Sequence, residues 1–172
     1  MILTTVTPVL ATANEAAVWF LVRHAEKEAT GSNPHLSSAG SQRAGQLATL
    51  LSGAGIEAVL SSDYHRTRQT AAPLARRLDV EIEMYDPSDM PALAATLRER
   101  GGRVLVVGHS NTTPELAELL GGEAGAEIDE PGEYDRLYVL TRQPGGPVST
   151  VLLRYGKPFR RMREHMSRDG RY

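Results

Sequence analysis

The chain has 172 residues, which is enough for one domain with a substantial core. Its formal net charge of −2 creates no overall field that would attract nucleic acid, so no nucleic-acid partner is expected. The absence of cysteine excludes disulfides, thiol catalysis and zinc–thiolate sites. No apolar run approaches the roughly 18 residues needed to span a bilayer, so no membrane span is expected.

The first 17 residues are open to two interpretations. They contain no lysine or arginine, so the positive segment of a secretory signal is missing. Yet Ile2 to Leu10 is mildly apolar, and Ala11-Thr12-Ala13 has the small-x-small form of a cleavage site. The segment is either the remnant of an export signal or a loosely packed leader, so both a cytoplasmic and an exported location stay open.

The first predicted strand is the apolar run Val18 to Val22, which is followed at once by Arg23 and His24. Strands of parallel sheets are buried on both faces and therefore read as continuous hydrophobic runs. In open α/β sheets the ligand crevice lies beyond the carboxyl ends of the strands. Arg23 and His24 are therefore placed where a site is expected, although an Arg-His pair alone could simply end a strand.

Apolar periodicity and turn residues predict an alternation of helices and strands along the rest of the chain. Thr67 to Leu78 is expected to kink or to start late because Pro73 lies inside it. The predicted elements are a helix carrying Ala44 to Leu51, a strand at 58–60, the helix at 67–78, a strand at 80–84, a helix capped by Ser88 or Asp89, a strand at 104–107, a helix capped by Thr113, and a hairpin of strands at 137–140 and 150–155.

This alternation predicts an α/β fold, a three-layer αβα sandwich with a mostly parallel central sheet. The expected domain covers residues 18–156. Residues 157–172 form a basic tail, which is either a solvated segment or a docking surface for an anionic partner.

Three of the predicted strands run into polar side chains. The first leads to Arg23 and His24, the second to Arg66 and the third to His109. If these strands are parallel neighbours, two histidines and two arginines meet at one edge of the sheet. Guanidinium groups match phosphate oxygens in a bidentate manner, and amides at the start of the helix after His109 would add donors. The arrangement predicts a small cationic site for a phosphoryl group.

The motifs narrow the chemistry of that site. There is no glycine-rich loop ending in Lys-Ser or Lys-Thr, so hydrolysis of the P-loop type is not expected. Metal binding is disfavoured because arginines beside a cation would repel it, and no cofactor is expected. The best remaining nucleophile is a neutral imidazole, whose other nitrogen must be held as N–H.

Four segments together resemble the motifs of the histidine phosphatase superfamily, the phosphoglycerate-mutase-like enzymes. Leu21-Val22-Arg23-His24-Ala25-Glu26 resembles the Arg-His-Gly signature, with alanine in place of the commoner glycine. The second motif is similar to Ser61 to Ala71 (Ser-Ser-x-x-x-Arg-x-x-Gln-Thr-Ala), and the third to Val106 to Asn111 (Val-Val-Gly-His-Ser-Asn). Pro34 to Gly40 (Pro-x-Leu-Ser-x-x-Gly) resembles the family's link into the first helix.

This resemblance implies a phosphoglycerate-mutase-like fold of the small single-domain branch and an enzyme that needs no metal. It also implies that His24 is the phosphorylated nucleophile, and that Arg23, Arg66 and His109 bind the phosphoryl group. Arg66, rather than Arg68, falls on the family's arginine position. Further substrate-binding candidates are Ser110, Asn111 and Asn33.

The general acid of the family has no matching motif in this chain. Ser110 occupies the position directly after the second histidine, where some members carry aspartate. Glu83, Asp86 and Asp89 lie in the region where other members carry glutamate, and Asp86 is the preferred candidate. The alternative for each is a solvated loop carboxylate.

The expected activity is that of a phosphatase, which hydrolyses a phosphomonoester or a phosphoramidate through a phosphohistidine on His24. The chain is short, and few residues between the motifs are free to cover the site, which favours transfer to water over mutase transfer. The alternatives are a phosphotransferase of the phosphoglycerate mutase type and an inactive module that binds a phosphorylated ligand. Expected partners are a phosphorylated small molecule or a phosphoprotein, and neither the substrate nor the oligomeric state follows from the sequence.

Overall fold

The computed structural model describes residues 15–160 of the chain. The predictions of a leader and of a basic tail fall almost entirely on residues 1–14 and 161–172, which lie outside the described residues. Within the described part, no helix is long and apolar enough to cross a bilayer.

A six-stranded sheet forms the centre of the molecule, with the strand order β3-β2-β4-β1-β5-β6. The first four strands in this order are parallel, and the hairpin of the last two adds an antiparallel edge. The strands are β1 (Ala17–Arg23), β2 (Ala58–Ser62), β3 (Ile82–Tyr85), β4 (Gly102–Gly108), β5 (Arg136–Arg142) and β6 (Val148–Arg154). The predicted mostly parallel sheet is confirmed.

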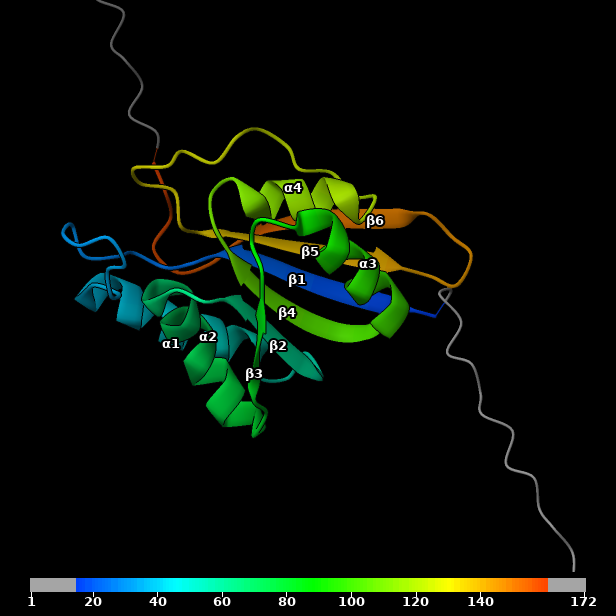
Figure 1. Cartoon of the computed structure of the whole chain (residues 1–172), viewed down its shortest axis with the longest axis horizontal. Helices are drawn as coiled ribbons and strands as arrows, with labels where there is room; N and C mark the ends of the chain where they lie inside the picture. Colours follow the sequence, from blue (N-terminus) through cyan, green and yellow to red (C-terminus); the bar gives the residue numbers. More distant parts are fainter. Residues whose placement is uncertain (1–14, 161–172) are drawn as a thin grey trace, which may run out of the picture.

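Four helices cover the two faces of this sheet (Figure 1). Successive strand residues point to opposite faces, so β1 sends Trp19 to one core and Phe20 to the other. Leu97 and Leu116 pack in the first core, and Leu47 and Leu74 pack in the second. The helices are α1 (Ser38–Leu51) and α2 (His65–Leu78) on one side, and α3 (Met90–Arg100) and α4 (Thr112–Leu119) on the other. The predicted three-layer sandwich is therefore confirmed.

Two helices begin earlier than the sequence predicts. The helix α2 starts at His65 rather than Thr67, because the Asn33 side chain accepts a hydrogen bond from the His65 amide at 3.0 Å. It continues through Pro73. The helix α4 starts at Thr112 with Asn111 at its N-cap, so the prediction of Thr113 as the cap was wrong.

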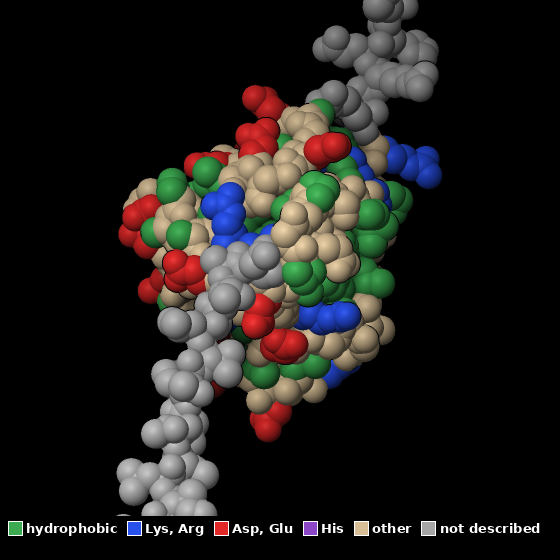
Figure 2. Space-filling model, turned by 90° about the vertical axis from the view of Figure 1, so that its right-hand side faces the viewer, with side chains coloured by type: hydrophobic (Ala, Val, Ile, Leu, Met, Phe, Trp, Pro, Cys, Tyr) green, Lys and Arg blue, Asp and Glu red, His purple; other side chains and the backbone are tan. Residues whose placement is uncertain are grey.

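The parallel strands β1, β2 and β4 bring their carboxyl ends to one edge of the sheet. Arg23 lies opposite Gly108 in the register, and Ser61 lies opposite Val107. Figure 2 looks onto the other end of the molecule, where acidic, basic and apolar side chains are mixed and no histidine of the described residues is visible. The polar residues that follow these strands are thus gathered at a single end of the domain.

Close contact between α1 and the loop after β1 depends on Gly40. A Cβ atom at this position would lie 2.0 Å from the carbonyl oxygen of Glu26, which is a backbone atom. The same loop is tied to the helix by the Ser37 amide, which donates to that Glu26 oxygen at 2.9 Å. Glycine is required here because α1 must reach the backbone two residues beyond His24.

We predict that Gly40→Ala lowers the free energy of unfolding by about 1–3 kcal/mol, because the added methyl group forces α1 away from the loop. Gly45 of the same helix is the matched control, since nothing lies within 4 Å of a Cβ added there. Gly45→Ala should raise the stability by up to about 1 kcal/mol through helix propensity. Urea denaturation of both variants checks the prediction, and a stabilised Gly40→Ala would contradict it.

Candidate active site

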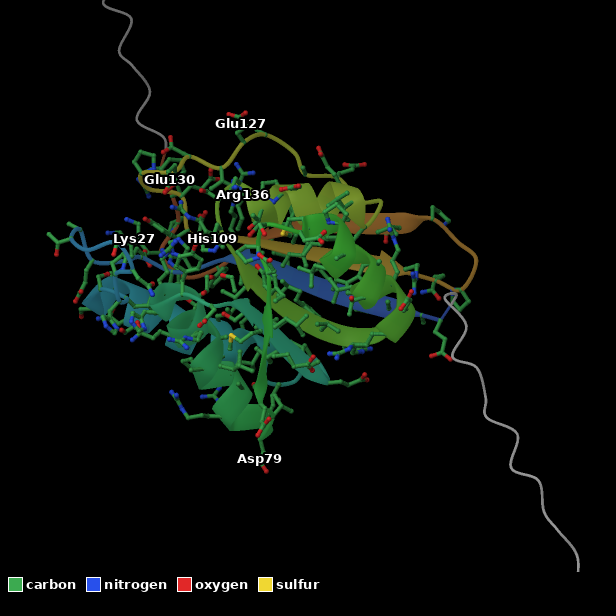
Figure 3. The ribbon with its side chains drawn as sticks, viewed as in Figure 1. Lys27, Asp79, His109, Glu127, Glu130 and Arg136 are labelled. Atoms are coloured by element: carbon green, nitrogen blue, oxygen red, sulfur yellow. The ribbon has the colours of Figure 1, made fainter. Side chains whose placement is uncertain are left out.

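A pocket of about 310 Å³ opens at the carboxyl end of the parallel strands. Its walls come from the loops after β1, β2, β3 and β4 and from the loop between α4 and β5. Lys27 and His109 lie at this end of the molecule with Glu130 above them (Figure 3). The lining residues are His24, Lys27, Tyr64, Arg66, Pro87, His109, Ser110, Asn111, Thr112 and Glu130.

His24 is held rigidly at the end of β1. Its backbone amide donates to the Gly108 carbonyl at 2.9 Å, and this bond joins the ends of β1 and β4. Its Nδ1 lies 2.8 Å from the carbonyl oxygen of Ala25. Because a carbonyl oxygen can only accept, Nδ1 carries the hydrogen and Nε2 keeps its lone pair. The side chain therefore has the tautomer that a nucleophilic imidazole requires.

Both histidines of the pocket are neutral at physiological pH. Burial lowers the pKa of His24 to about 3, against the opposing hydrogen bond to Ala25, and the charges of Arg23 and Arg66 add to the effect. Burial and the same two arginines lower the pKa of His109 to about 4. The two rings meet edge to face with their centroids 5.6 Å apart. The imidazole of His24 is consequently available for attack without prior loss of a proton.

His109 is oriented by β2 and α2. Its Nε2 lies 2.9 Å from the Ser62 hydroxyl, which in turn donates to the Thr67 hydroxyl at 3.2 Å. Its Nδ1 lies 3.4 Å from Nη2 of Arg66, and a guanidinium can only donate. In the neutral ring Nε2 thus bears the hydrogen and Nδ1 is the acceptor.

Arg23 is the most deeply buried charge of the site, with 1% of its surface exposed. Its Nη1 donates to the carbonyl of Glu133 at 3.0 Å, and its Nη2 forms an ion pair with Glu130 at 3.0 Å. The Tyr134 ring lies under the guanidinium, 4.1 Å from its central carbon. Its Nε is buried and has no hydrogen-bond partner among the described residues.

Arg66 lies one residue inside α2 and reaches the same pocket. Its guanidinium stacks on the Tyr64 ring at 4.4 Å, and its Nε is buried without a partner among the described residues. Arg68 instead turns to the surface, where it pairs with Asp63 at 3.0 Å. The structure thus places Arg66, and not Arg68, beside the two histidines.

Two further residues of the second motif hold the loop that carries His24. Thr70 accepts a hydrogen bond from the Ala25 amide at 2.9 Å and donates to the Arg66 carbonyl at 2.7 Å. The Gln69 side chain accepts from the Leu36 amide at 2.8 Å. These hydrogen bonds of Thr70 and Gln69 connect α2 to the loop after β1, which explains why the two residues belong to the motif.

The remaining predicted site residues divide into two groups. Ser110 and Asn111 line the pocket. Asn33 does not, because its side-chain oxygen is engaged in capping α2. The prediction of Asn33 as a substrate-binding residue therefore has no support in the geometry.

Asp86 is not placed to act as a general acid. Its carboxylate accepts from both the amide and the hydroxyl of Ser88, at 2.8 and 2.7 Å, and it is fully exposed. These bonds hold the pKa of Asp86 below its usual value, which is the wrong direction for a proton donor. Glu83 pairs with Arg100, and Asp89 caps α3. None of the three carboxylates lines the pocket.

Sequence reasoning missed several residues that complete the site. Glu130 and Tyr134 contact Arg23. Ser62 contacts His109, Tyr64 contacts Arg66, and Lys27 lines the wall of the pocket. Glu130 belongs to the acidic, glycine-rich loop between α4 and β5. The length of this loop could have indicated a contribution to the site, because long segments without regular structure in compact domains are often functional.

The described residues contain no group of three or more histidine, aspartate or glutamate side chains arranged to hold a metal ion. Arg66 and Lys27 line the pocket with positive charge, and the charge of the buried Arg23 also acts on both histidines.

Comparison with known proteins agrees with this architecture. The family model described as the histidine phosphatase superfamily (branch 1) matches residues 19–87, which span the first and second motifs. The chain is thus similar to the histidine phosphatase superfamily over these two motifs. The third motif, with His109, lies outside the matched residues, and it is the fold that brings it to His24.

Solved structures show the fold of the superfamily at low sequence identity. The chain is similar to the protein histidine phosphatase SixA in complex with tungstate, with 22% identity and a TM-score of 0.62 over 80% of this chain and 96% of that one. It is similar to a mycobacterial glucosyl-3-phosphoglycerate phosphatase, with 15% identity and a TM-score of 0.62 over 82% and 99%. The α-ribazole phosphatase of Shigella flexneri matches with 16% identity and a TM-score of 0.57 over 72% and 89%. No match was found among curated proteins.

We predict that the folded protein becomes less stable in acid because it keeps His24 neutral. Below about pH 6.5 the unfolded chain binds a proton at this histidine, whereas the folded protein does so only near its pKa of about 3. Stability should therefore fall as the pH falls through this window. His24→Asn removes the titration, so the variant should lose less unfolding free energy than the wild type between about pH 7 and about pH 4.5. Urea denaturation at the two pH values measures the difference, and equal losses would contradict it.

Proposed function

We propose that the protein is a phosphatase that hydrolyses a phosphomonoester or a phosphoramidate through a phosphohistidine on His24. The observation that carries the proposal is a pair of unsatisfied donors. The Nε atoms of Arg23 and Arg66 are both buried without hydrogen-bond partners among the described residues, and both belong to residues next to His24. Buried polar groups are almost always hydrogen-bonded, so an unpaired pair of guanidinium donors calls for an acceptor.

The geometry of Arg23 makes that acceptor an oxyanion with several oxygens. Its Nη1 is fixed by a backbone carbonyl, so the edge left for a ligand is that of Nε, which is unpaired, and Nη2, which is paired with the exposed Glu130 carboxylate. This edge matches two oxygens of a phosphoryl group in a bidentate manner. Arg66 and the amides at the start of α4 supply further positive charge, which is the main requirement of phosphoryl transfer.

His24 is suited to accept the phosphoryl group. In the first step its Nε2 lone pair attacks phosphorus, a P–N bond forms, and the bond between phosphorus and the leaving group breaks. In the second step water attacks phosphorus, the P–N bond breaks, and inorganic phosphate leaves. The hydrogen bond from Nδ1 to Ala25 keeps the ring in the required tautomer through both steps.

His109 is expected to stabilise the transferred oxygens. In the neutral ring its Nε2–H is given to Ser62, so only Nδ1 remains for the substrate. A bound phosphate anion raises the pKa of a neighbouring histidine because the opposite charge favours the protonated ring. Protonation at Nδ1 then turns His109 into a donor for the phosphoryl group.

We expect the purified protein to hydrolyse p-nitrophenyl phosphate in the presence of excess chelator. A phosphoenzyme that is labile in acid and stable in alkali should accumulate after rapid quenching, and it should be absent from His24→Ala. Absence of turnover would support a binding module instead, and wild-type turnover by His24→Ala would exclude the mechanism. Transfer of the phosphoryl group to an added alcohol in preference to water would support a mutase.

We predict that Arg66→Ala costs about 2–4 kcal/mol of transition-state stabilisation, as expected for the loss of an oriented charged donor. Arg68→Ala is the matched control, since this arginine lies on the same helix and pairs with Asp63 at the surface. It should lower kcat/KM by less than about threefold, because exposed ion pairs contribute little. Equal losses in the two variants would contradict the placement of Arg66 at the phosphoryl group.

A further inference from the structure

An alcohol leaves phosphorus readily only if its oxygen receives a proton during the reaction. The carboxylates expected to supply this proton from the region after the second motif lie outside the pocket. Among the described residues that line the pocket, Glu130 is the one with a carboxyl group. It is carried by the loop between α4 and β5, at the same end of the molecule as His109 and Lys27 (Figure 3).

The contacts of Glu130 place its carboxylate at the rim of the predicted phosphoryl site. One oxygen, Oε2, lies 3.0 Å from Nη2 of Arg23 and accepts a hydrogen bond from the Ser110 hydroxyl at 3.1 Å. It therefore occupies only one of the two donors on the Arg23 edge, and Nε stays unpaired. With 60% of its side chain exposed, Glu130 can give up its bond to Nη2 of Arg23 to an incoming anion and remain solvated.

Glu133, three residues further along the chain, differs from Glu130 in exposure, hydrogen bonding and position relative to the pocket. Burial alone would raise the pKa of Glu133, but hydrogen bonds from Arg136, Asp129 and Arg154 lower it to about 2. That carboxylate is 4% exposed and does not line the pocket. Glu133 therefore holds the loop in place, while Glu130 is left free to exchange partners.

We propose that Glu130 is the proton donor to the leaving group and the proton acceptor from the attacking water. This assignment rests on the proposed phosphatase function. A phosphoryl group on the Nε–Nη2 edge of Arg23 brings its negative charge next to the Glu130 carboxylate, and a like charge favours the protonated form of a carboxyl group. Binding of the substrate thus loads the proton at the place where the leaving oxygen needs it.

The two steps balance as follows. When His24 attacks phosphorus, the P–O bond to the alcohol breaks, and the Glu130 carboxyl gives its proton to the departing oxygen. When water attacks the phosphohistidine, the water proton passes to the Glu130 carboxylate, the P–N bond breaks, and His24 returns to its neutral form. Glu130 is thereby restored to the protonated state with which the cycle began.

The first test compares leaving groups in Glu130→Gln. We expect kcat/KM for an aliphatic ester such as 2-glycerophosphate to fall about 100-fold, the usual contribution of a general acid. For p-nitrophenyl phosphate, whose leaving group needs little protonation, the fall should be less than about threefold. Equal losses for both esters, or no loss for either, would overturn the assignment.

Glu127→Gln is the matched control, because Glu127 lies in the same loop (Figure 3), is exposed and does not line the pocket that contains the two histidines. It removes the same charge from the same segment, and both esters should be hydrolysed at the wild-type rate. A selective loss for the aliphatic ester in Glu127→Gln as well would show an effect of loop charge and overturn the role of Glu130.

A second test does not depend on turnover. Sulfate is a dianion that does not titrate near neutral pH, so its binding near pH 6 can be followed by calorimetry in buffers of different ionisation enthalpy. The wild type and Glu127→Gln should take up more protons on binding sulfate than Glu130→Gln does. Equal proton uptake in all three proteins would overturn the assignment of Glu130. If the wild type instead binds sulfate with the expected proton uptake but hydrolyses no ester, only the phosphatase function is contradicted.

Discussion

A buried guanidinium is the constraint around which this end of the domain is organised. Arg23 is the last residue of the central strand β1 and is 1% exposed, so its charge must be compensated by the protein. The loop between α4 and β5 provides this compensation with the Glu133 carbonyl, the Glu130 carboxylate and the Tyr134 ring. The requirement to satisfy one side chain thus fixes the course of a long irregular segment.

The loop between α4 and β5 is also held in place by a second group of charged side chains. Glu133 accepts hydrogen bonds from Arg136 and Arg154, and Arg154 also pairs with Asp135. These contacts belong to β5 and β6, the antiparallel edge of the sheet. The hairpin that departs from the parallel arrangement therefore has a role at the site, because it supports the loop that closes over Arg23.

The part of the site that could be predicted from sequence is the part that regular structure dictates. Arg23, His24, Arg66 and His109 each follow a strand, and the parallel arrangement of β1, β2 and β4 brings such positions together whatever the loops do. The roles of these four residues remain predictions, but their proximity follows from the topology of the sheet.

The predicted site residues that lie away from the pocket are polar residues in loops. Asn33 caps a helix 32 residues away in sequence, and Asp86 closes a turn on Ser88. Both residue types favour such local and capping bonds, and nothing in the order of the residues distinguishes that use from substrate binding. Glu130 was missed for the converse reason, since its partner Arg23 lies 107 residues earlier and only the fold brings them together.

This division between sheet and loops also bears on how a substrate is selected. The groups proposed to bind a phosphoryl group are held by strand ends and by α2, and buried hydrogen bonds such as those of Thr70 and Ser62 leave them little freedom. The rim is instead formed by Lys27, Pro87 and Glu130, each from a different loop. Proteins with this fold carry names that refer to quite different phosphorylated compounds. In the proposed phosphatase, discrimination between leaving groups would therefore reside in the rim, because contacts to the phosphoryl group do not depend on what the phosphate is attached to.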